Sequence, residues 1–410
     1  MMALAVDIPR PSLLARWSLS LLLPVLSLAL GIAYAWIDRP GLPYDEPSHW
    51  STVLYYANHH RLPVLGDPGV TYEAQMGPVA YVVDAAVVRL ARAAGLSASS
   101  AFHLVRLVGV VELCAAVVLV GILTRRLLGR SWAAAGAVAI FALNPMLLTM
   151  SSSVQNDTLA LVLGLVALEL ALARLSDRPT FRAALVVGAV AGVAVLTKLT
   201  SWAAVVAVAA WLIWRHRRGA LQPLAAFIVA VIAVSGWWFI RNIDLYGDPT
   251  AAAGVHRSGV SFSAYHVHGV SDVGHVLEQL VTYLWLPTEY VRNFISAPTA
   301  LKGGLLVATV AALIAGSIRT RSWRKVPRWL IVSTGILSIA SWLVTYLAYQ
   351  AIAPRVAYLF LPLWIGLVGS ALARLLRRAA MMGVALSLLC LNAWTLYELS
   401  RVHSPVFLHF

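Results

Sequence analysis

The chain has 410 residues, of which 60% are hydrophobic and only 12% are charged. This composition excludes a water-soluble globular domain and indicates a polytopic membrane protein. The formal charge of +14 does not indicate a nucleic-acid partner, because the basic residues stand at the ends of apolar runs. That is where the positive-inside rule predicts them in a membrane protein.

The apolar runs predict an all-α fold with about eleven transmembrane helices, in a single transmembrane domain that covers residues 1–410. The runs lie near residues 17–37, 102–124, 132–151, 157–173, 181–197, 199–214, 220–240, 300–318, 329–349, 355–373 and 379–399. Several are shorter than the roughly 20 residues of a full crossing, so we expect these helices to tilt or to end inside the membrane. The first run is long enough to be a retained helix rather than a signal peptide.

Charge sets the predicted orientation in the plasma membrane. The basic clusters lie before residue 17 and near residues 125–130, 174–182, 215–218, 319–328 and 374–378. The rule places them, and the N-terminus, in the cytoplasm. Two long polar stretches, about 38–101 and 241–298, are then external loops without a separate soluble domain. Within the first loop, the helical spacing of apolar residues from Pro78 to Arg92 predicts a juxtamembrane helix that lies in the interface plane.

The first external loop begins with the motif Asp45-Glu46-Pro47-Ser48-His49. Two carboxylates and a histidine beside a bilayer suit a site where a hydroxyl loses a proton or a cation is held. In a simpler interpretation, Asp45 is only the N-cap of a helix that begins near Pro47. That interpretation does not account for Glu46 and His49, so the motif predicts a functional site.

A second acidic motif, Gln155-Asn156-Asp157-Thr158, stands at the external end of the third predicted span. Asp157 could simply cap the following helix. Alternatively, Asn156 and Asp157 face the same cleft as Asp45, through hydrogen bonds or through a shared cation. The sequence leaves both interpretations open.

Lys198 stands in a turn between two unusually short spans. Only 32 residues lie between Arg182 and Arg215, so each helix has about 16 residues and reaches roughly 24 Å, short of a core about 30 Å thick. The turn should therefore lie below the outer surface, in a cavity where a lysine needs an anionic partner. The alternative is a lysine that extends its ammonium group to the interface.

Two more cations stand at external helix ends. Arg241 and Asn242 follow Trp237-Trp238, and Arg355 opens the tenth span, with Tyr358 close behind. Each arginine alone could be an interfacial anchor. Together with Lys198, they would suit a phosphate whose lipid tail stays in the bilayer.

Four histidines in the second external loop, His256, His266, His268 and His275, have a spacing that matches no closed zinc site. These histidines therefore do not predict a zinc site. A divalent cation at the Asp45 motif remains a candidate cofactor, and its identity is unknown.

At these motifs the chain resembles the GT-C class of integral membrane glycosyltransferases, close to its protein O-mannosyltransferase and aminoarabinose-transferase branch. The resemblance rests on residues 44–49, 72–78, 154–157 with 196–198, 236–249 and 355–362. Two departures from the class stand out. Gly77-Pro78 replaces the two prolines of many relatives, and two residues separate Arg355 from Tyr358, whose counterparts are usually adjacent.

The resemblance implies inverting transfer of a sugar from a polyprenyl-phosphate donor to an acceptor hydroxyl at the external face. The acceptor could be a protein, a glycan, a lipid or a small metabolite, and no nucleic acid is involved. The implied residues are Asp45, Glu46 and His49 for catalysis, Lys198, Arg241, Arg355 and Tyr358 for the donor phosphate, and Asn156, Asp157, Glu73 and Gln75 in support. Two alternatives remain: a transporter or flippase of lipid-linked glycans, which would need the cations but no base, and a non-catalytic partner in assembly of the cell envelope.

Overall fold

The computed structural model describes residues 13–42, 45–59, 61–257, 270–287, 297–349 and 358–402, and these residues form helices joined by short turns. Most long helices correspond directly to the predicted spans. They are α1 (Leu13–Ile37), α4 (Ala98–Leu128), α7 (Asp157–Arg174), α8 (Phe181–Thr197), α9 (Trp202–His216), α10 (Leu221–Tyr246), α13 (Thr299–Ser317), α14 (Lys325–Tyr349), α15 (Leu361–Leu375) and α16 (Ala380–Arg401).

The third predicted span is a bent pair, α5 (Trp132–Ala142) and α6 (Pro145–Ser151), whose axes differ by 49°. Asn144 lies at the bend and its side chain accepts a hydrogen bond from the Leu147 N–H at 3.1 Å. Pro145 follows at the start of α6, where a missing N–H costs nothing. Asn144 therefore ends one helix and begins the next.

Each predicted span thus has a helical counterpart, and the all-α membrane fold is confirmed. The number eleven is approximate. By length and composition alone, six helices of the described residues can cross a membrane, or seven if the bent pair is one span. Leu21–Ile37 and Phe181–Thr197 are shorter apolar helices, as expected for spans that tilt or end within the bilayer.

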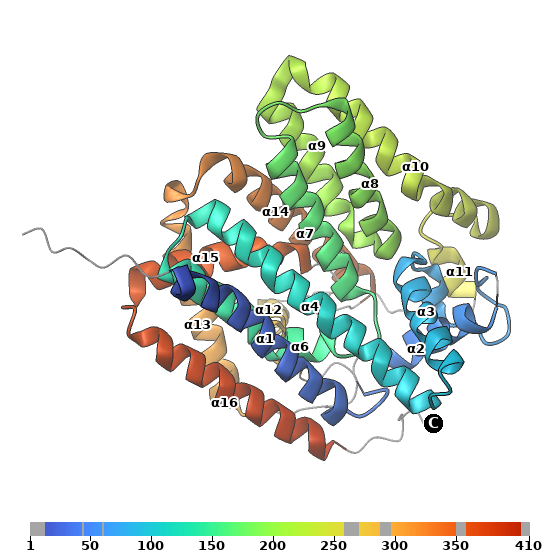
Figure 1. Cartoon of the computed structure of the whole chain (residues 1–410), viewed down its shortest axis with the longest axis horizontal. Helices are drawn as coiled ribbons and strands as arrows, with labels where there is room; N and C mark the ends of the chain where they lie inside the picture. Colours follow the sequence, from blue (N-terminus) through green and yellow to red (C-terminus); the bar gives the residue numbers. More distant parts are fainter. Residues whose placement is uncertain are drawn as a thin grey trace, which may run out of the picture.

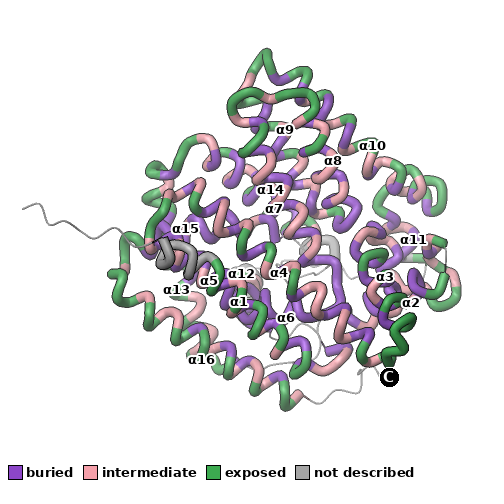
Figure 2. The backbone as a smooth tube through the Cα atoms, viewed as in Figure 1, coloured by how far each residue is buried: buried purple, intermediate pink, exposed green. Residues whose placement is uncertain are grey.

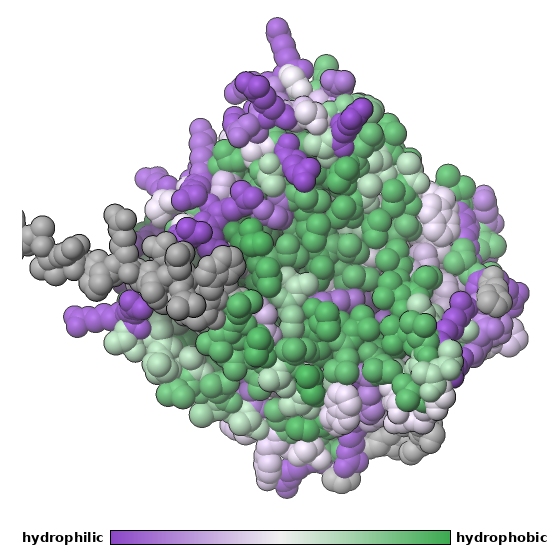
Figure 3. Space-filling view, in the orientation of Figure 1, coloured by the Kyte–Doolittle hydropathy of each residue, from purple (hydrophilic) through white to green (hydrophobic). Residues whose placement is uncertain are grey.

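The helices pack into one bundle (Figure 1). Within it, α8 lies against α10 and α7, α1 against α4, and α13 against α15. Buried residues gather where α4 and α7 meet, whereas much of α16 is exposed (Figure 2). Hydrophobic side chains cover the middle of the face in Figure 3, and hydrophilic ones gather near α9 at the top and along the right edge near α2 and α3. This distribution suits a bundle whose polar ends leave the bilayer.

The segment between α1 and α4 folds at one end of the bundle, at the right of Figure 1. Its helices are α2 (Glu46–Asn58), the 3₁₀ turn η1 (Tyr72–Gln75) and α3 (Val79–Ala93). The helix α3 corresponds to the expected juxtamembrane helix and packs against α2 and α4. Trp50, Tyr81, Phe102 and Val154 share one buried cluster, so hydrophobic packing fixes this loop on the bundle.

The remaining elements are short. They are the 3₁₀ turns η2 (Leu199–Ser201), η3 (Arg217–Ala220) and η4 (Thr320–Ser322), together with α11 (Ala252–Arg257) and α12 (Val270–Trp285), which lie between α10 and α13. The Asn144 side chain donates a hydrogen bond to the Leu284 carbonyl at 2.9 Å, which joins α12 to the bend between α5 and α6.

Candidate active site

Asp45 occupies the N-cap position of α2 but does not act as a cap. Its side chain makes no capping hydrogen bond, and its backbone is left-handed, with φ 35° and ψ 6°. A non-glycine residue held in this region carries strain that the surrounding structure must support, and such residues gather at functional sites. Tyr72 is hydrogen-bonded to the Asp45 carboxylate. The pKa of Tyr72 is raised, mainly by burial and to a smaller extent by the negative charges of Glu73 and Asp45. The capping interpretation therefore does not explain Asp45.

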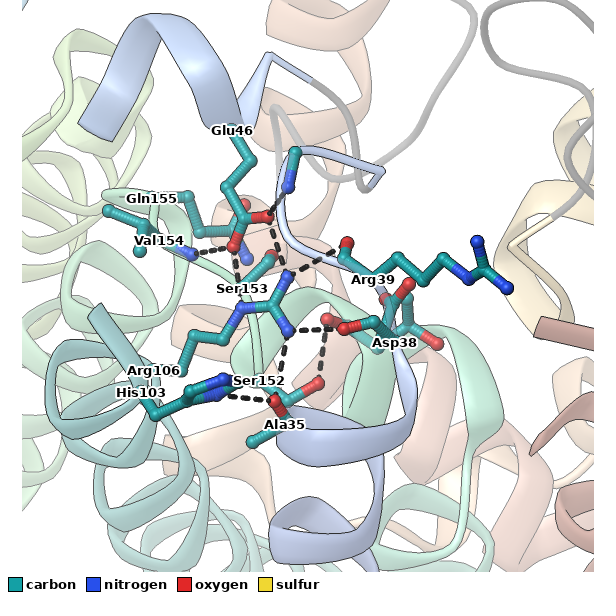
Figure 4. Close-up of polar contacts among 12 residues, drawn as sticks. Ala35, Asp38, Arg39, Glu46, His103, Arg106, Ser152, Ser153, Val154 and Gln155 are labelled. Carbon is teal, nitrogen blue, oxygen red and sulfur yellow. Dashed lines mark hydrogen bonds and ion pairs between the residues drawn. The ribbon is translucent and has the colours of Figure 1, made fainter. Parts of the chain in front are cut away.

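Glu46, the next residue, is fully buried and accepts hydrogen bonds from three separate parts of the chain (Figure 4). Arg106 of α4 donates from Nε at 2.9 Å and from Nη2 at 2.6 Å. The backbone N–H groups of Gly41 and Val154 donate at 2.7 and 2.8 Å. A bidentate pair with further donors is the arrangement that compensates the desolvation of a buried carboxylate.

Arg106 was not among the residues singled out from the sequence. Its guanidinium also donates to the carbonyls of Ala35 at 2.9 Å, Asp38 at 2.6 Å and Arg39 at 3.3 Å. One fully buried side chain thus joins the end of α1 and the following turn to Glu46. The sequence could have identified Arg106, because an arginine inside the apolar run 102–124 requires a polar partner.

Asp38 lies beside this network with its carboxylate fully buried. Burial raises the pKa of Asp38 to about 8, the positive charge of Arg106 opposes the shift, and Glu46 adds to it. The protonated form of Asp38 is therefore favoured in the folded protein at neutral pH.

His49 belongs to a buried polar cluster between α2, η1 and α3. Its Nδ1 lies 2.8 Å from the Tyr81 hydroxyl, and its Nε2 lies 3.7 Å from Glu73 Oε1. The Tyr81 hydroxyl donates to Glu73 Oε2 at 3.4 Å. Burial raises the pKa of Tyr81, and the charge of Glu73 adds to the effect. The two predicted residues His49 and Glu73 are thus brought together, through a tyrosine that the sequence reasoning did not identify.

Lys198 ends α8 and is buried, with 7% of its surface exposed. Its Nζ lies 2.5 Å from Asp157 Oδ1 and 3.4 Å from Asn156 Oδ1. The Asn156 side chain also donates to the Thr197 carbonyl at 3.3 Å. The prediction that a lysine in this turn needs an anionic partner agrees with this geometry, whereas a lysine extended to the interface does not.

Gly77 brings these two groups of residues together. A Cβ atom at Gly77 would lie 1.7 Å from the Leu196 carbonyl oxygen, so the loop that carries Glu73 and the half-buried Gln75 packs directly on the end of α8. The negative charge of Asp157 also acts on Tyr81. The glycine in place of a proline thus has a physical reason, since no side chain fits against this backbone.

The other predicted cations do not join this group through the contacts described. Arg241 of α10 donates from Nη2 to the Pro63 carbonyl at 2.6 Å and lies 4.9 Å from the centre of the Trp238 ring. Its Nη1 is buried without a hydrogen-bond partner among the described residues. Tyr358 is buried in the main hydrophobic core, and Arg355 lies outside the described residues.

Within the described residues, no group of three or more His, Cys, Asp or Glu side chains is placed to hold a metal ion. His266 and His268 lie outside those residues. The expected divalent cation stays a prediction.

Comparison with known families agrees with this architecture. Residues 90–239 match the family described as dolichyl-phosphate-mannose-protein mannosyltransferase. This segment includes Arg106, Asn156, Asp157 and Lys198. A search of curated proteins finds no match.

Solved structures of membrane proteins share the fold. ArnT from Cupriavidus metallidurans bound to undecaprenyl phosphate has a TM-score of 0.59 at 16% identity, with 93% of this chain and 64% of that chain covered. The oligosaccharyltransferase AglB from Archaeoglobus fulgidus, in complex with an inhibitory peptide and a dolichol-phosphate, has a TM-score of 0.55 at 14% identity. That match covers 95% of this chain and 56% of AglB.

A third structure extends the likeness. The arabinofuranosyltransferase AftD from Mycobacteria has a TM-score of 0.52 at 17% identity, with 94% of this chain and 26% of that chain covered. This chain therefore has the GT-C fold of membrane glycosyltransferases, which confirms the resemblance seen in its motifs. The chain spans less than two thirds of the length of ArnT.

Proposed function

We propose that this protein is a membrane glycosyltransferase that moves a sugar from a polyprenyl-phosphate donor to an acceptor hydroxyl. The observation that carries the proposal is the position of Asp45. Its strained backbone, the absence of a capping bond, and the buried pair Glu46–Arg106 beside it suit a base rather than a helix cap.

In the proposed reaction, Asp45 accepts the proton of the acceptor hydroxyl as its oxygen attacks the anomeric carbon of the donor. The bond from that carbon to the phosphate oxygen breaks, and the polyprenyl phosphate leaves with the electron pair. One displacement inverts the configuration and needs no covalent enzyme intermediate. Tyr72 orients the Asp45 carboxylate through its hydrogen bond, and His49 and Glu73 support the loop through Tyr81.

Lys198 is the cation that we propose for the departing phosphate. An ammonium group has three donors, and the contacts to Asp157 and Asn156 account for two of them. The third can approach a phosphate oxygen at the end of α8. We propose Arg241, through its buried Nη1, and Arg355 as further partners of the same phosphate, with Tyr358 beside Arg355.

We also propose that the site faces the exterior and that the N-terminus is cytoplasmic, as the basic clusters predict. Cysteine substitution in intact cells tests this topology. A membrane-impermeant thiol reagent should label Asp67→Cys in the first external loop and should not label His216→Cys at the end of α9. External labelling of His216→Cys would reverse the assigned sides.

Product analysis tests the reaction itself. Purified protein is incubated with defined polyprenyl-phosphate sugars and with peptide, glycan, lipid or small-molecule acceptors, and the products are identified by mass spectrometry. The proposal expects a glycosylated acceptor of inverted configuration with the native protein and little product with Asp45→Asn. Equal product from both proteins would exclude Asp45 as the base.

A further inference from the structure

A groove lies between α2 and α3, beyond the residues around Asp45. It has a volume of about 570 Å³ and is lined by Tyr56, His59, Arg61, Leu62 and one side of α3 from Val82 to Leu90. Tyr56 follows Asp45 by eleven residues, most of them in α2, so the groove lies about 17 Å along the helix from Asp45. It is therefore distinct from the position of Asp45, although its lining residue Leu62 precedes Pro63, whose carbonyl accepts a hydrogen bond from Arg241.

The α3 wall of the groove is apolar but exposed. Val82, Ala86 and Leu90 follow one another at steps of four residues, which places them on one side of the helix. Val82 is 51% and Leu90 is 71% exposed. An apolar row that remains exposed at the polar end of a membrane bundle indicates contact with lipid.

The rim of the groove is basic. The Arg89 side chain is exposed, and it also donates from Nε to the Ala57 carbonyl at 3.0 Å and from Nη2 to the Tyr56 carbonyl at 2.6 Å. Arg61 also lines the groove, from the segment that follows α2, and its exposed side chain forms an ion pair with Asp67 at 3.2 Å. Such a surface pair is weak and can exchange its partner. The two guanidinium groups, with one carboxylate and His59, make this rim positive.

We propose that this groove binds one anionic phospholipid, with its phosphate between Arg61 and Arg89 and an acyl chain along Val82, Ala86 and Leu90. Guanidinium groups bind phosphate oxygens in pairs, and the apolar row lies on the same wall of the groove as Arg89. The bound lipid would hold α2 and α3, which carry His49 and Tyr81, against the membrane surface. The proposal does not depend on the transfer reaction.

Lipid binding can be measured directly on the full-length protein. The protein is placed in nanodiscs of equal parts phosphatidylcholine and phosphatidylglycerol, released, and the retained lipids are counted by native mass spectrometry. We expect one retained phosphatidylglycerol and preference over phosphatidylcholine by at least about ten-fold, since each basic residue near a surface contributes about five-fold. Equal retention of the two lipids would overturn the proposal.

Substitutions locate the site. Arg61→Gln and Leu90→Gln should each weaken retention by about five-fold or more, because one removes a phosphate partner and the other places a polar group in the acyl path. Arg178→Gln is the matched control, since Arg178 is an exposed arginine between α7 and α8. For Arg89→Gln, thermal unfolding is measured beside lipid retention, because Arg89 also binds the last carbonyls of α2 and its loss can destabilise the helix.

Three outcomes would contradict the assignment: retention unchanged in Arg61→Gln and Leu90→Gln, an equal loss in Arg178→Gln, or full displacement of the lipid by soluble glycerol phosphate. The last would show that the groove holds a free phosphate rather than a lipid. None of these measurements uses sugar transfer, so failure of this proposal and failure of the proposed enzyme activity are distinguishable.

Discussion

Glu46 and Arg106 form a bidentate ion pair in which neither side chain is exposed, although sixty residues separate them in the chain. The pair joins the residue after Asp45 to the long helix α4. Because Arg106 also binds three carbonyls at the end of α1 and in the turn after it, it fixes the backbone that leads into the strained turn at Asp45.

Arg106→Gln should destabilise the protein by about 3–5 kcal/mol, because it leaves the buried Glu46 carboxylate without its charged partner. Thermal unfolding in detergent measures the effect. Arg126→Gln is the control, since Arg126 also lies on α4 and binds Glu169 at 2.5 Å, but its side chain is 39% exposed. That variant should lose about 1 kcal/mol or less. Equal losses in the two variants would contradict a special role for Arg106.

Asp45→Asn should lower sugar transfer by roughly 10²–10⁴ while the protein stays folded, because the amide keeps the shape of the side chain but accepts no proton. The initial rate of product formation measures the effect, with far-UV circular dichroism as the check on folding. Asp67 is another acid of the segment between α1 and α4, and Asp67→Asn should transfer sugar at the native rate. Near-normal turnover in Asp45→Asn would exclude Asp45 as the base.

Lys198→Met should weaken donor binding strongly, but it also removes the ammonium partner of the buried Asp157 carboxylate and so destabilises the fold. The double variant Lys198→Met/Asp157→Asn removes both charges and should recover thermal stability without recovering donor binding. Loss of one contact to a buried phosphate corresponds to about 2–4 kcal/mol of binding free energy. The affinity for a labelled polyprenyl-phosphate sugar tests whether Lys198 binds the donor phosphate. Native affinity in the double variant would show that the phosphate binds elsewhere.

Gly77→Ala should displace the loop that carries Glu73 from the end of α8, because the added methyl group meets the Leu196 carbonyl rather than a movable side chain. We expect a transfer rate at least about ten-fold lower, together with a lower unfolding temperature. Gly219→Ala is the control, since nothing lies within 4 Å of the added atom. A fully active Gly77→Ala protein would show that this close packing is not needed.

The buried carboxyl group of Asp38 predicts a pH dependence of stability. Its pKa is about 8 in the folded protein and about 3.9 when unfolded. As the pH rises, the unfolded chain therefore releases this proton at a lower pH than the folded protein does. The contribution of Asp38 to stability is full below about pH 4 and is lost as the pH rises to about 8. Asp38→Asn removes this dependence.

Over that window, the stability of Asp38→Asn relative to the native protein should rise by up to about 1.4 kcal/mol per pH unit. Unfolding curves of both proteins, recorded in detergent from pH 5 to pH 9, measure the difference. A constant difference across the range would show that Asp38 is already ionised in the folded protein.

The sequence alone predicted the membrane class, the helical fold and the approximate ends of the helices, because the length of an apolar run and the charges beside it are local properties. It also singled out Asp45, Asp157 and Lys198, since isolated charges beside a bilayer are costly. The pairing of Lys198 with Asp157 follows the expectation of an anionic partner, and only their positions in space identify that partner.

Which residues meet depends on the way the helices pack. Arg106 stands sixty residues from Glu46, and Gly77 lies far along the chain from Leu196. Tyr81 joins His49 to Glu73 from another helix. Such contacts depend on how helices pack, and packing is set by the shapes of many distant side chains together. A local pattern can show that a buried charge needs a partner, but the partner itself is chosen by the fold.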